Sequence, residues 1–136
     1  MHAVYAQSVG RWRMDSIRDL SVIIVNWNVR ELLRRCLASL VRGASASAEG
    51  VFPLPGGRSF EIWVVDNGSS DGSPEMVQQA FPGVHLRQSE NRGFAAGNNL
   101  GIAESQGHYL LLLNPDTEVV GDALTVLLDY MDAHGD

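Results

Sequence analysis

The hydrophobic positions of this 136-residue chain form short β-branched runs that alternate with longer stretches of helical spacing. A strand covered on both faces reads as a continuous apolar run, whereas an amphipathic helix repeats its apolar residues every three or four positions. These patterns predict strands at 21–25, 60–65, 84–87 and 108–113, and helices at about 29–42, 74–81, 93–104 and 122–133. Strands that alternate with helices in this way predict an α/β fold built on a parallel sheet.

Two segments lack such a pattern. Residues 1–19 show no clear period, and we expect a disordered N-terminal extension there, ahead of one domain at 20–136. Residues 43–59 are rich in Gly, Ala, Ser and Pro, which predicts a long and mobile loop.

Polar clusters follow three of the predicted strands, at 26–28, 66–71 and 114–116. Because ligands bind beyond the carboxyl ends of parallel strands, we expect these clusters to meet at one ligand-binding edge. Ordinary turn chemistry is the alternative: Asn28 would cap the first helix, Asp71 or Ser73 would cap the second, and residues 114–117 would form a simple turn. Trp27 fits either a stacking surface for a nucleobase or packing at a strand end.

Composition and missing motifs narrow the choice of ligand. A net charge of −6 argues against a nucleic-acid partner. The Gly-x-Gly-x-x-Gly fingerprint of dinucleotide-binding domains and the P-loop motif are both absent. A bound diphosphate would therefore need another source of positive charge, and a divalent cation on Asp116 would supply it. The single cysteine, Cys36, lies in a helical apolar stripe and is interpreted as a buried structural thiol.

Several segments together carry a family resemblance: Ser21-Val-Ile-Ile-Val-Asn-Trp-Asn28, Val64-Val-Asp-Asn-Gly-Ser-Ser-Asp-Gly-Ser73, Glu90-Asn-Arg-Gly-Phe-Ala-Ala-Gly-Asn-Asn-Leu-Gly101 and Tyr109-Leu-Leu-Leu-Leu-Asn-Pro-Asp-Thr117. They resemble family 2 glycosyltransferases, and the Asn-Pro-Asp form resembles their rhamnosyltransferase-like branch. The resemblance runs from Leu20 to the end of the chain. It implies the GT-A fold, a Rossmann-like α/β fold, and only its N-terminal, donor-binding half.

The resemblance also implies the site. Asn114 and Asp116 occupy the outer positions of the family's Asp-x-Asp motif, with Asp116 as the ligand of Mg²⁺ or Mn²⁺. Asn98 is implied as a further neighbour of the donor. The nucleotide-binding residues implied are Val25, Trp27, Asp66, Asn67, Asp71, Asn99 and Asn114.

The implied function is metal-assisted transfer of a sugar from a nucleotide-diphosphate donor, with dTDP- or UDP-sugars favoured. The acceptor would be a saccharide or a lipid-linked saccharide of cell-surface polysaccharide synthesis, in the cytoplasm or at the inner face of the membrane. The catalytic base is expected in a C-terminal half beyond Asp136, so none is assigned. A half-domain is expected to self-associate or to pack against that C-terminal half. The alternatives are a nucleotide-sugar-binding module without activity and, more distantly, a sugar-1-phosphate nucleotidyltransferase.

Overall fold

The computed structural model describes residues 4–8 and 18–134, as alternating strands and helices. Its strands are β1 (Val4–Ser8), β2 (Arg18–Asn26), β3 (Phe52–Pro53), β4 (Ser59–Asp66), β5 (His85–Gln88) and β6 (Gly107–Leu113). Its helices are α1 (Arg30–Val41), the short 3₁₀ helix η2 (Pro55–Gly57), α2 (Ser73–Ala80), α3 (Phe94–Glu104) and α4 (Ala123–His134). The four strands and four α-helices expected from the sequence are all present, within a few residues of their predicted bounds.

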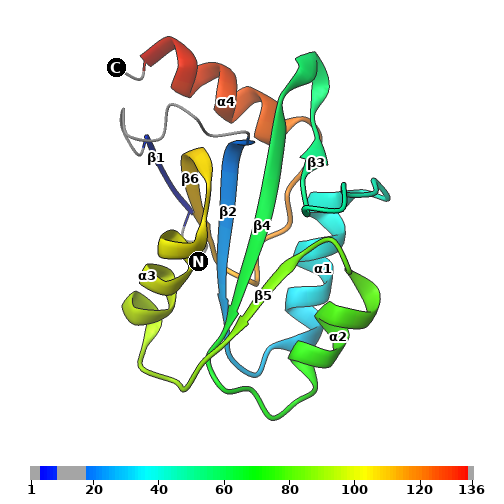
Figure 1. Cartoon of the computed structure of the whole chain (residues 1–136), viewed down its shortest axis with the longest axis vertical. Coiled ribbons are helices and arrows are strands. Elements are labelled where there is room, and N and C mark those ends of the chain that lie inside the picture. The colour runs from blue at the N-terminus through cyan, green and yellow to red at the C-terminus, as the bar shows by residue number, and fades with distance from the viewer. Residues whose placement is uncertain (1–3, 9–17, 135–136) are drawn as a thin grey trace.

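The strands form one sheet in the order β1-β6-β2-β4, and β3 and β5 both pair with β4 (Figure 1). The four predicted strands, β2, β4, β5 and β6, are parallel to their neighbours in this group. The prediction of an α/β fold with a parallel sheet is therefore confirmed. The carboxyl ends of β2, β4 and β6 consequently lie at one edge of the sheet.

Two antiparallel strands were not expected. Residues 4–8, inside the predicted disordered extension, form β1 and pair with β6 in a register from Val4↔Leu113 to Ser8↔Tyr109. The rest of residues 1–17 lies outside the described part of the chain. The predicted loop at 43–59 contains β3, which pairs with the start of β4, and η2. Both are short edge strands that a local pattern does not reveal: the partner of β1 is about 100 positions away, and β3 is only two residues long.

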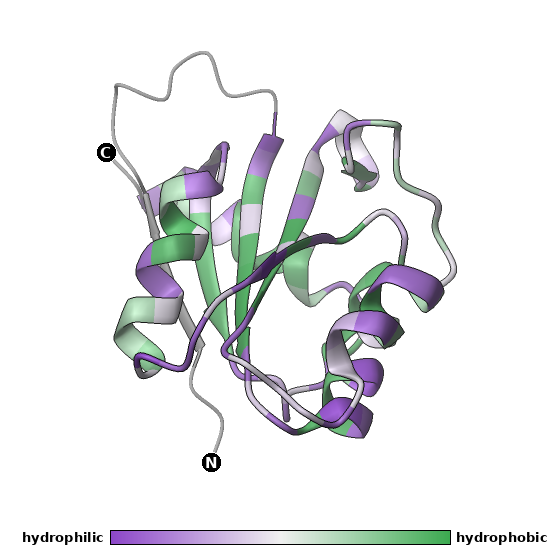
Figure 2. Ribbon diagram, turned by 60° about the horizontal axis from the view of Figure 1, so that its bottom comes forward, coloured by the Kyte–Doolittle hydropathy of each residue, from purple (hydrophilic) through white to green (hydrophobic). Residues whose placement is uncertain are grey.

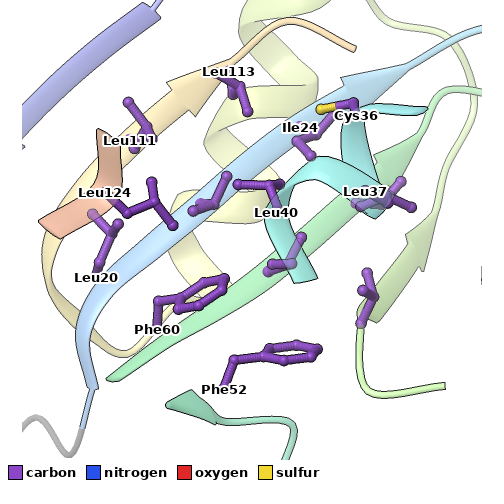
Figure 3. Packing of buried hydrophobic residues seen from close by; sticks show 14 of the residues in the cluster. Leu20, Ile24, Cys36, Leu37, Leu40, Phe52, Phe60, Leu111, Leu113 and Leu124 are labelled. Carbon is purple, nitrogen blue, oxygen red and sulfur yellow. The ribbon is translucent and has the colours of Figure 1, made fainter. Parts of the chain in front are cut away.

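Helices cover the two faces of the sheet unequally. Inward side chains of α1, α2 and α4 join those of β2, β4 and β6 in one core cluster, part of which Figure 3 shows from close by. Cys36 lies in this cluster and is fully buried, as predicted. Figure 2 shows hydrophobic colour along the central strands and hydrophilic colour on many of the segments around them.

Helix α3 lies on the opposite face of the sheet from α1 and α2 (Figure 1). Its contact with β2 depends on two glycines one turn apart. A Cβ atom at Gly97 would lie 2.8 Å from Val25 Cγ1, and one at Gly101 would lie 2.4 Å from Ile23 Cγ2. Larger residues at these positions would push α3 away from the sheet, because packed interiors leave no room for an extra methyl group.

The end of the sheet remote from the ligand edge contains a buried charged network. Glu61, which is 1% exposed, accepts hydrogen bonds from the Ser21 hydroxyl and the Gln106 backbone N–H, each at 2.6 Å. Its other carboxylate oxygen lies 3.2 Å from Nε of the buried Arg18 and 3.8 Å from Nε2 of His85. Burial of a carboxylate is costly unless it is paired and hydrogen-bonded, and this network meets both conditions.

Polar contacts join α4 to the rest of the domain. The Tyr109 hydroxyl donates to Asp132 Oδ1 at 2.8 Å, and Arg58 pairs with both Asp129 and Asp132. Burial and the bond to Asp132 raise the pKa of Tyr109 to about 12. None of the helices in the described ranges has the length and apolar character needed to cross a membrane.

Candidate functional site

The segments that follow β2 and β4 are joined by hydrogen bonds at the carboxyl edge of the sheet. The Asn26 amide donates to Asp66 Oδ1 at 3.0 Å and to Ser69 Oγ at 3.3 Å. The Asn28 backbone N–H donates to Ser69 Oγ at 2.9 Å, and the Ser70 N–H donates to Asn28 Oδ1 at 2.8 Å. Two of the three predicted polar clusters therefore form one connected network. We call these two segments, residues 26–30 and 66–71, the paired loops.

Asp66 is part of this network and is 2% exposed. Its Oδ1 accepts from Asn26 and from the Ser69 hydroxyl, and its Oδ2 accepts from the Ser69 backbone N–H at 2.8 Å. A carboxylate offers about four acceptor positions, so one position on Oδ2 is left after these bonds. The side-chain hydrogen bonds of Asp66 in the structure are thus all made within the paired loops.

Asp71 joins the beginnings of two helices. Its Oδ2 accepts from the Arg30 N–H at 2.9 Å, in the first turn of α1, and its Oδ1 accepts from the Ser73 N–H at 3.1 Å, where α2 begins. Burial opposes ionisation of Asp71, but the hydrogen bonds from Ser73 and Arg30 outweigh it, so the pKa of the carboxyl is lowered. The prediction that Asn28 caps α1 is wrong: no side chain of the preceding residues caps this helix, and Asp71 bonds its first turn instead.

Trp27 and Val25, both predicted to lie against a nucleoside, have different surroundings. The Trp27 side chain is 54% exposed, although both flanking residues are held in the paired loops. This exposure favours a stacking surface over packing at a strand end. Val25 is 7% exposed and packs beneath Gly97 of α3, so it forms part of the floor of this edge.

A hollow of about 500 Å³ lies between the end of β5 and the first turns of α3. The polar residues that line it include two predicted ones, Asn67 and Asn99, and four that the sequence did not single out for a role, Arg87, Ser89, Glu90 and Arg92. The arginines form ion pairs, Arg87 with Glu104 at 3.0 Å and Arg92 with Glu90 at 3.8 Å. Glu90 and Arg92 lie in one of the segments that carry the family resemblance, and this resemblance was the only sequence feature that could have pointed to them. Asn98 is 6% exposed and thus buried beside the hollow's Gly97.

The third predicted cluster follows β6, the other neighbour of β2. The Thr117 N–H donates to the Asn114 carbonyl at 3.1 Å, which closes a turn with Pro115 at its second position. Asn114 is half-buried and Asp116 is exposed. The sheet therefore places both residues on the predicted edge, one strand away from the paired loops.

The fit of a divalent cation follows from the donor atoms available. In the described ranges, no group of three or more His, Cys, Asp or Glu residues is arranged to hold a metal. One exposed carboxylate on Asp116 with the neutral amide of Asn114 fits Mg²⁺ or Mn²⁺ whose other ligands are phosphate oxygens and water. Cys36 is fully buried, and burial and the charges of Asp116 and Glu118 raise the pKa of its thiol to about 12.

Comparison with known proteins identifies the family. The model of the family described as "Glycosyl transferase family 2" matches residues 21–136. The chain belongs to glycosyl transferase family 2. Among its relatives, the glycosyltransferase AglE of Haloferax volcanii is 34% identical over 101 residues, which are 71% of this chain and 30% of that protein. The succinoglycan biosynthesis protein ExoO of Rhizobium meliloti is 27% identical over 125 residues, 90% of this chain and 32% of that protein.

Solved structures show the same fold. Residues 1–349 of S. aureus TarS, crystallised in complex with UDP-GlcNAc, superimpose with a TM-score of 0.65 and 22% identity over 85% of this chain and 32% of that one. The mannosyltransferase PcManGT from Pyrobaculum calidifontis, in complex with GDP-Man and Mn²⁺, gives a TM-score of 0.64 and 21% identity over 90% of this chain and 35% of that one. The predicted GT-A fold is thus confirmed, and the chain spans about a third of the length of these proteins.

Proposed function

We propose that this chain binds a nucleotide-diphosphate-sugar at the edge formed by the paired loops, the hollow and the Asn114–Thr117 turn. It would serve as the donor-binding part of a glycosyltransferase acting on a saccharide or lipid-linked acceptor in cell-surface polysaccharide synthesis, in the cytoplasm or at the inner face of the membrane. The observation that carries this proposal is Trp27, an exposed aromatic ring between two residues that are firmly hydrogen-bonded at the carboxyl edge of a parallel sheet. Names such as ExoO and the S. typhimurium abequosyltransferase RfbV among the relatives support the polysaccharide context.

The described residues divide the work of donor binding between an aromatic surface and polar groups. Trp27 would stack on the nucleobase, and base–aromatic stacking of this kind contributes about 1–3 kcal/mol. Asn67 and Asn99 would offer amide groups to the base or ribose from the hollow that they line. Asp66 would use the remaining acceptor position on Oδ2, whereas Asp71 would act mainly by holding the paired loops to both helices.

The diphosphate would lie toward the Asn114–Thr117 turn, where Asp116 and Asn114 would hold Mg²⁺ or Mn²⁺. When bound, the cation supplies positive charge that stabilises the nucleoside diphosphate as it leaves the anomeric carbon. Asp116 fits this role because its exposed carboxylate stands on a turn closed by a hydrogen bond, at the end of a buried strand. A UDP- or dTDP-sugar remains our expectation for the donor, and we assign no catalytic base among these residues.

Titration calorimetry with UDP, dTDP and GDP, each with and without Mn²⁺, tests the proposal. We expect at least one nucleotide to bind more tightly with Mn²⁺. Asp116→Asn should weaken the Mn²⁺-dependent binding by about tenfold or more, the usual scale for loss of a group that supports a metal. The matched control is Glu118→Gln, which removes an exposed carboxylate two residues further along. Absence of heat with all three nucleotides would refute the proposed site, and equal losses in both variants would refute the role of Asp116.

A nucleotide-sugar-binding module without transferase activity is the alternative, and it predicts the same binding. The two differ in turnover only when another chain supplies an acceptor-binding half, so the chain alone is first incubated with a panel of nucleotide-sugars and saccharide acceptors as the baseline, and released nucleoside diphosphate is measured. We expect binding without sugar transfer by the chain alone, because no base is assigned. Sugar transfer at a rate above spontaneous hydrolysis would contradict that expectation.

A further inference from the structure

The backbone at Asn28 has a conformation that few residues adopt. Its φ angle is +54°, in the left-handed region, and it is one of two non-glycine residues with positive φ in the described ranges. This conformation is unfavourable for L-residues, although Asn tolerates it better than most because its short side chain bonds to nearby backbone. Such a conformation persists only when the surrounding structure determines it strongly.

Two hydrogen bonds to residues 66–71, the other of the paired loops, hold Asn28 in this conformation. Its backbone N–H donates to Ser69 Oγ at 2.9 Å, and its side-chain Oδ1 accepts from the Ser70 N–H at 2.8 Å. Asn28 is exposed, so these bonds hold it without help from core packing. On the other side of Trp27, the fully buried Asn26 is bonded to Asp66 and Ser69.

Trp27 therefore lies between two residues whose backbone positions are fixed, while its own ring is 54% exposed. An exposed side chain normally changes rotamer on the picosecond to nanosecond scale, and a flexible backbone adds slower and wider motion. A ring that must meet a flat ligand binds better when its backbone is already in the binding conformation, because less ordering is then required on binding. The left-handed turn at Asn28 sets the direction of the chain just after this ring.

We propose that Asn28 is a positioning residue: its left-handed conformation, held by Ser69 and Ser70, fixes the direction in which Trp27 faces the ligand edge. The proposal rests on the proposed function only for the identity of the ligand. Asn28 itself need not touch that ligand. Its effect passes through the backbone that it shares with Trp27.

Three substitutions at Asn28 separate the conformation from the hydrogen bond. Asn28→Asp keeps an acceptor for the Ser70 N–H and tolerates the left-handed region, whereas Asn28→Gly keeps the conformation and loses the acceptor. Asn28→Ala loses both. Because the residue is exposed, we expect all three variants to fold, and far-UV circular dichroism and urea unfolding verify this.

The first measurement uses no nucleotide. In a variant of this chain with Trp12→Phe and Trp63→Phe, time-resolved fluorescence anisotropy reports the motion of Trp27 alone. We expect the amplitude of nanosecond motion to rise about twofold in Asn28→Ala, to rise less in Asn28→Gly and to stay near the parent value in Asn28→Asp. Asn91→Ala is the matched control for this measurement, because it also removes a hydrogen bond that an exposed Asn side chain accepts from a backbone N–H, here that of Gly93. Unchanged motion of Trp27 in Asn28→Ala would overturn the proposal.

The second measurement is the dissociation constant of UDP with Mn²⁺, by calorimetry. We expect Asn28→Ala to raise it about five- to thirtyfold, the factor that corresponds to the cost of the left-handed region for an ordinary residue. Asn28→Gly should raise it about threefold through the lost hydrogen bond, and Asn28→Asp should leave it nearly unchanged. Increased motion of Trp27 with unchanged affinity would overturn the proposal. If even the parent chain binds no nucleotide, the proposed function fails, whereas the anisotropy series still decides whether Asn28 positions Trp27.

Discussion

Glu61→Ala should cause a large loss of stability, because it disrupts the buried network at the far end of the sheet. The change leaves the Arg18 guanidinium, 6% exposed, without the carboxylate that lies 3.2 Å from its Nε. Loss of one partner of a buried ion pair costs about 3–5 kcal/mol. Arg18 keeps its bonds to Gln106 Oε1 at 2.9 Å and to the Glu49 carbonyl at 3.4 Å, which favours the lower end of that range. The Ser21 hydroxyl and the Gln106 N–H lose their acceptor, which brings the expected loss to about 4 kcal/mol.

Urea unfolding followed by circular dichroism measures this loss, and thermal unfolding should show a decrease in Tm of about 10–20 °C. A double variant, Arg18→Met with Glu61→Met, removes both charges together. Apolar replacement of a whole buried pair is often nearly neutral. The free energy of unfolding lost in the double variant should therefore be about 2 kcal/mol smaller than the sum of the losses in its two component single variants, Arg18→Met and Glu61→Met.

The surface pair of Arg87 with Glu104 provides the control. Both side chains are more than 40% exposed, so Glu104→Ala should cost at most about 1 kcal/mol. A loss below 1 kcal/mol in Glu61→Ala would show that the network does not stabilise the sheet. Strictly additive effects in the double variant would show that the two charges are not coupled, and the reasoning from the ion pair would then be wrong.

Three further predictions concern α3, His85 and Asp71. Gly101→Ala should destabilise the chain by about 1–3 kcal/mol in urea unfolding, because the new methyl group would lie 2.4 Å from Ile23 Cγ2; a gain in stability would mean that helix propensity outweighs this contact. Burial, together with the charge of Arg18, lowers the pKa of His85 below 6.5 against the opposing effect of Glu61. The unfolded chain therefore binds this proton more readily, and stability should fall as pH decreases below about 6.5; His85→Gln should flatten that part of a pH series, and an unchanged slope would contradict the assignment. Asp71→Ala should cost about 1–2 kcal/mol by removing the bonds to both helix starts, and hydrogen exchange at the Arg30 and Ser73 amides should increase; unaltered exchange at either amide would contradict the shared cap.

The elements that the sequence predicted well are those that are determined locally. The runs that became β2, β4 and β6 are buried on both faces or nearly so, and continuous apolar runs indicate such strands directly. Strand β1 was missed because its stability comes from pairing with β6, about 100 positions away in sequence, and β3 was missed because two residues are too few to show a period. Their own residues carry little periodic signal.

The sequence was sufficient to predict which edge of the sheet carries the site, but not which side chains contact one another there. Parallel topology alone brings the segments after β2 and β4 together, so Asn26 and Asp66 were expected to be close. The sequence did not show that the cap of α1 comes from Asp71, which is 41 positions away from Arg30. Nor did it show that Arg87 would face the same hollow as Asn99, because this depends on where α3 lies on the sheet.

The pairing of β1 with β6 also constrains the order in which the chain can fold. During synthesis residues 4–8 emerge before the other described elements, yet their hydrogen-bonding partners, residues 109–113, are made after almost all of those elements. Strand β2, by contrast, can pair with β4 as soon as α1 and the following loop are complete. We therefore expect β1 to join the sheet last, as the slow and non-local step, and until then the outer edge of β6 is open to strands of other unfinished chains.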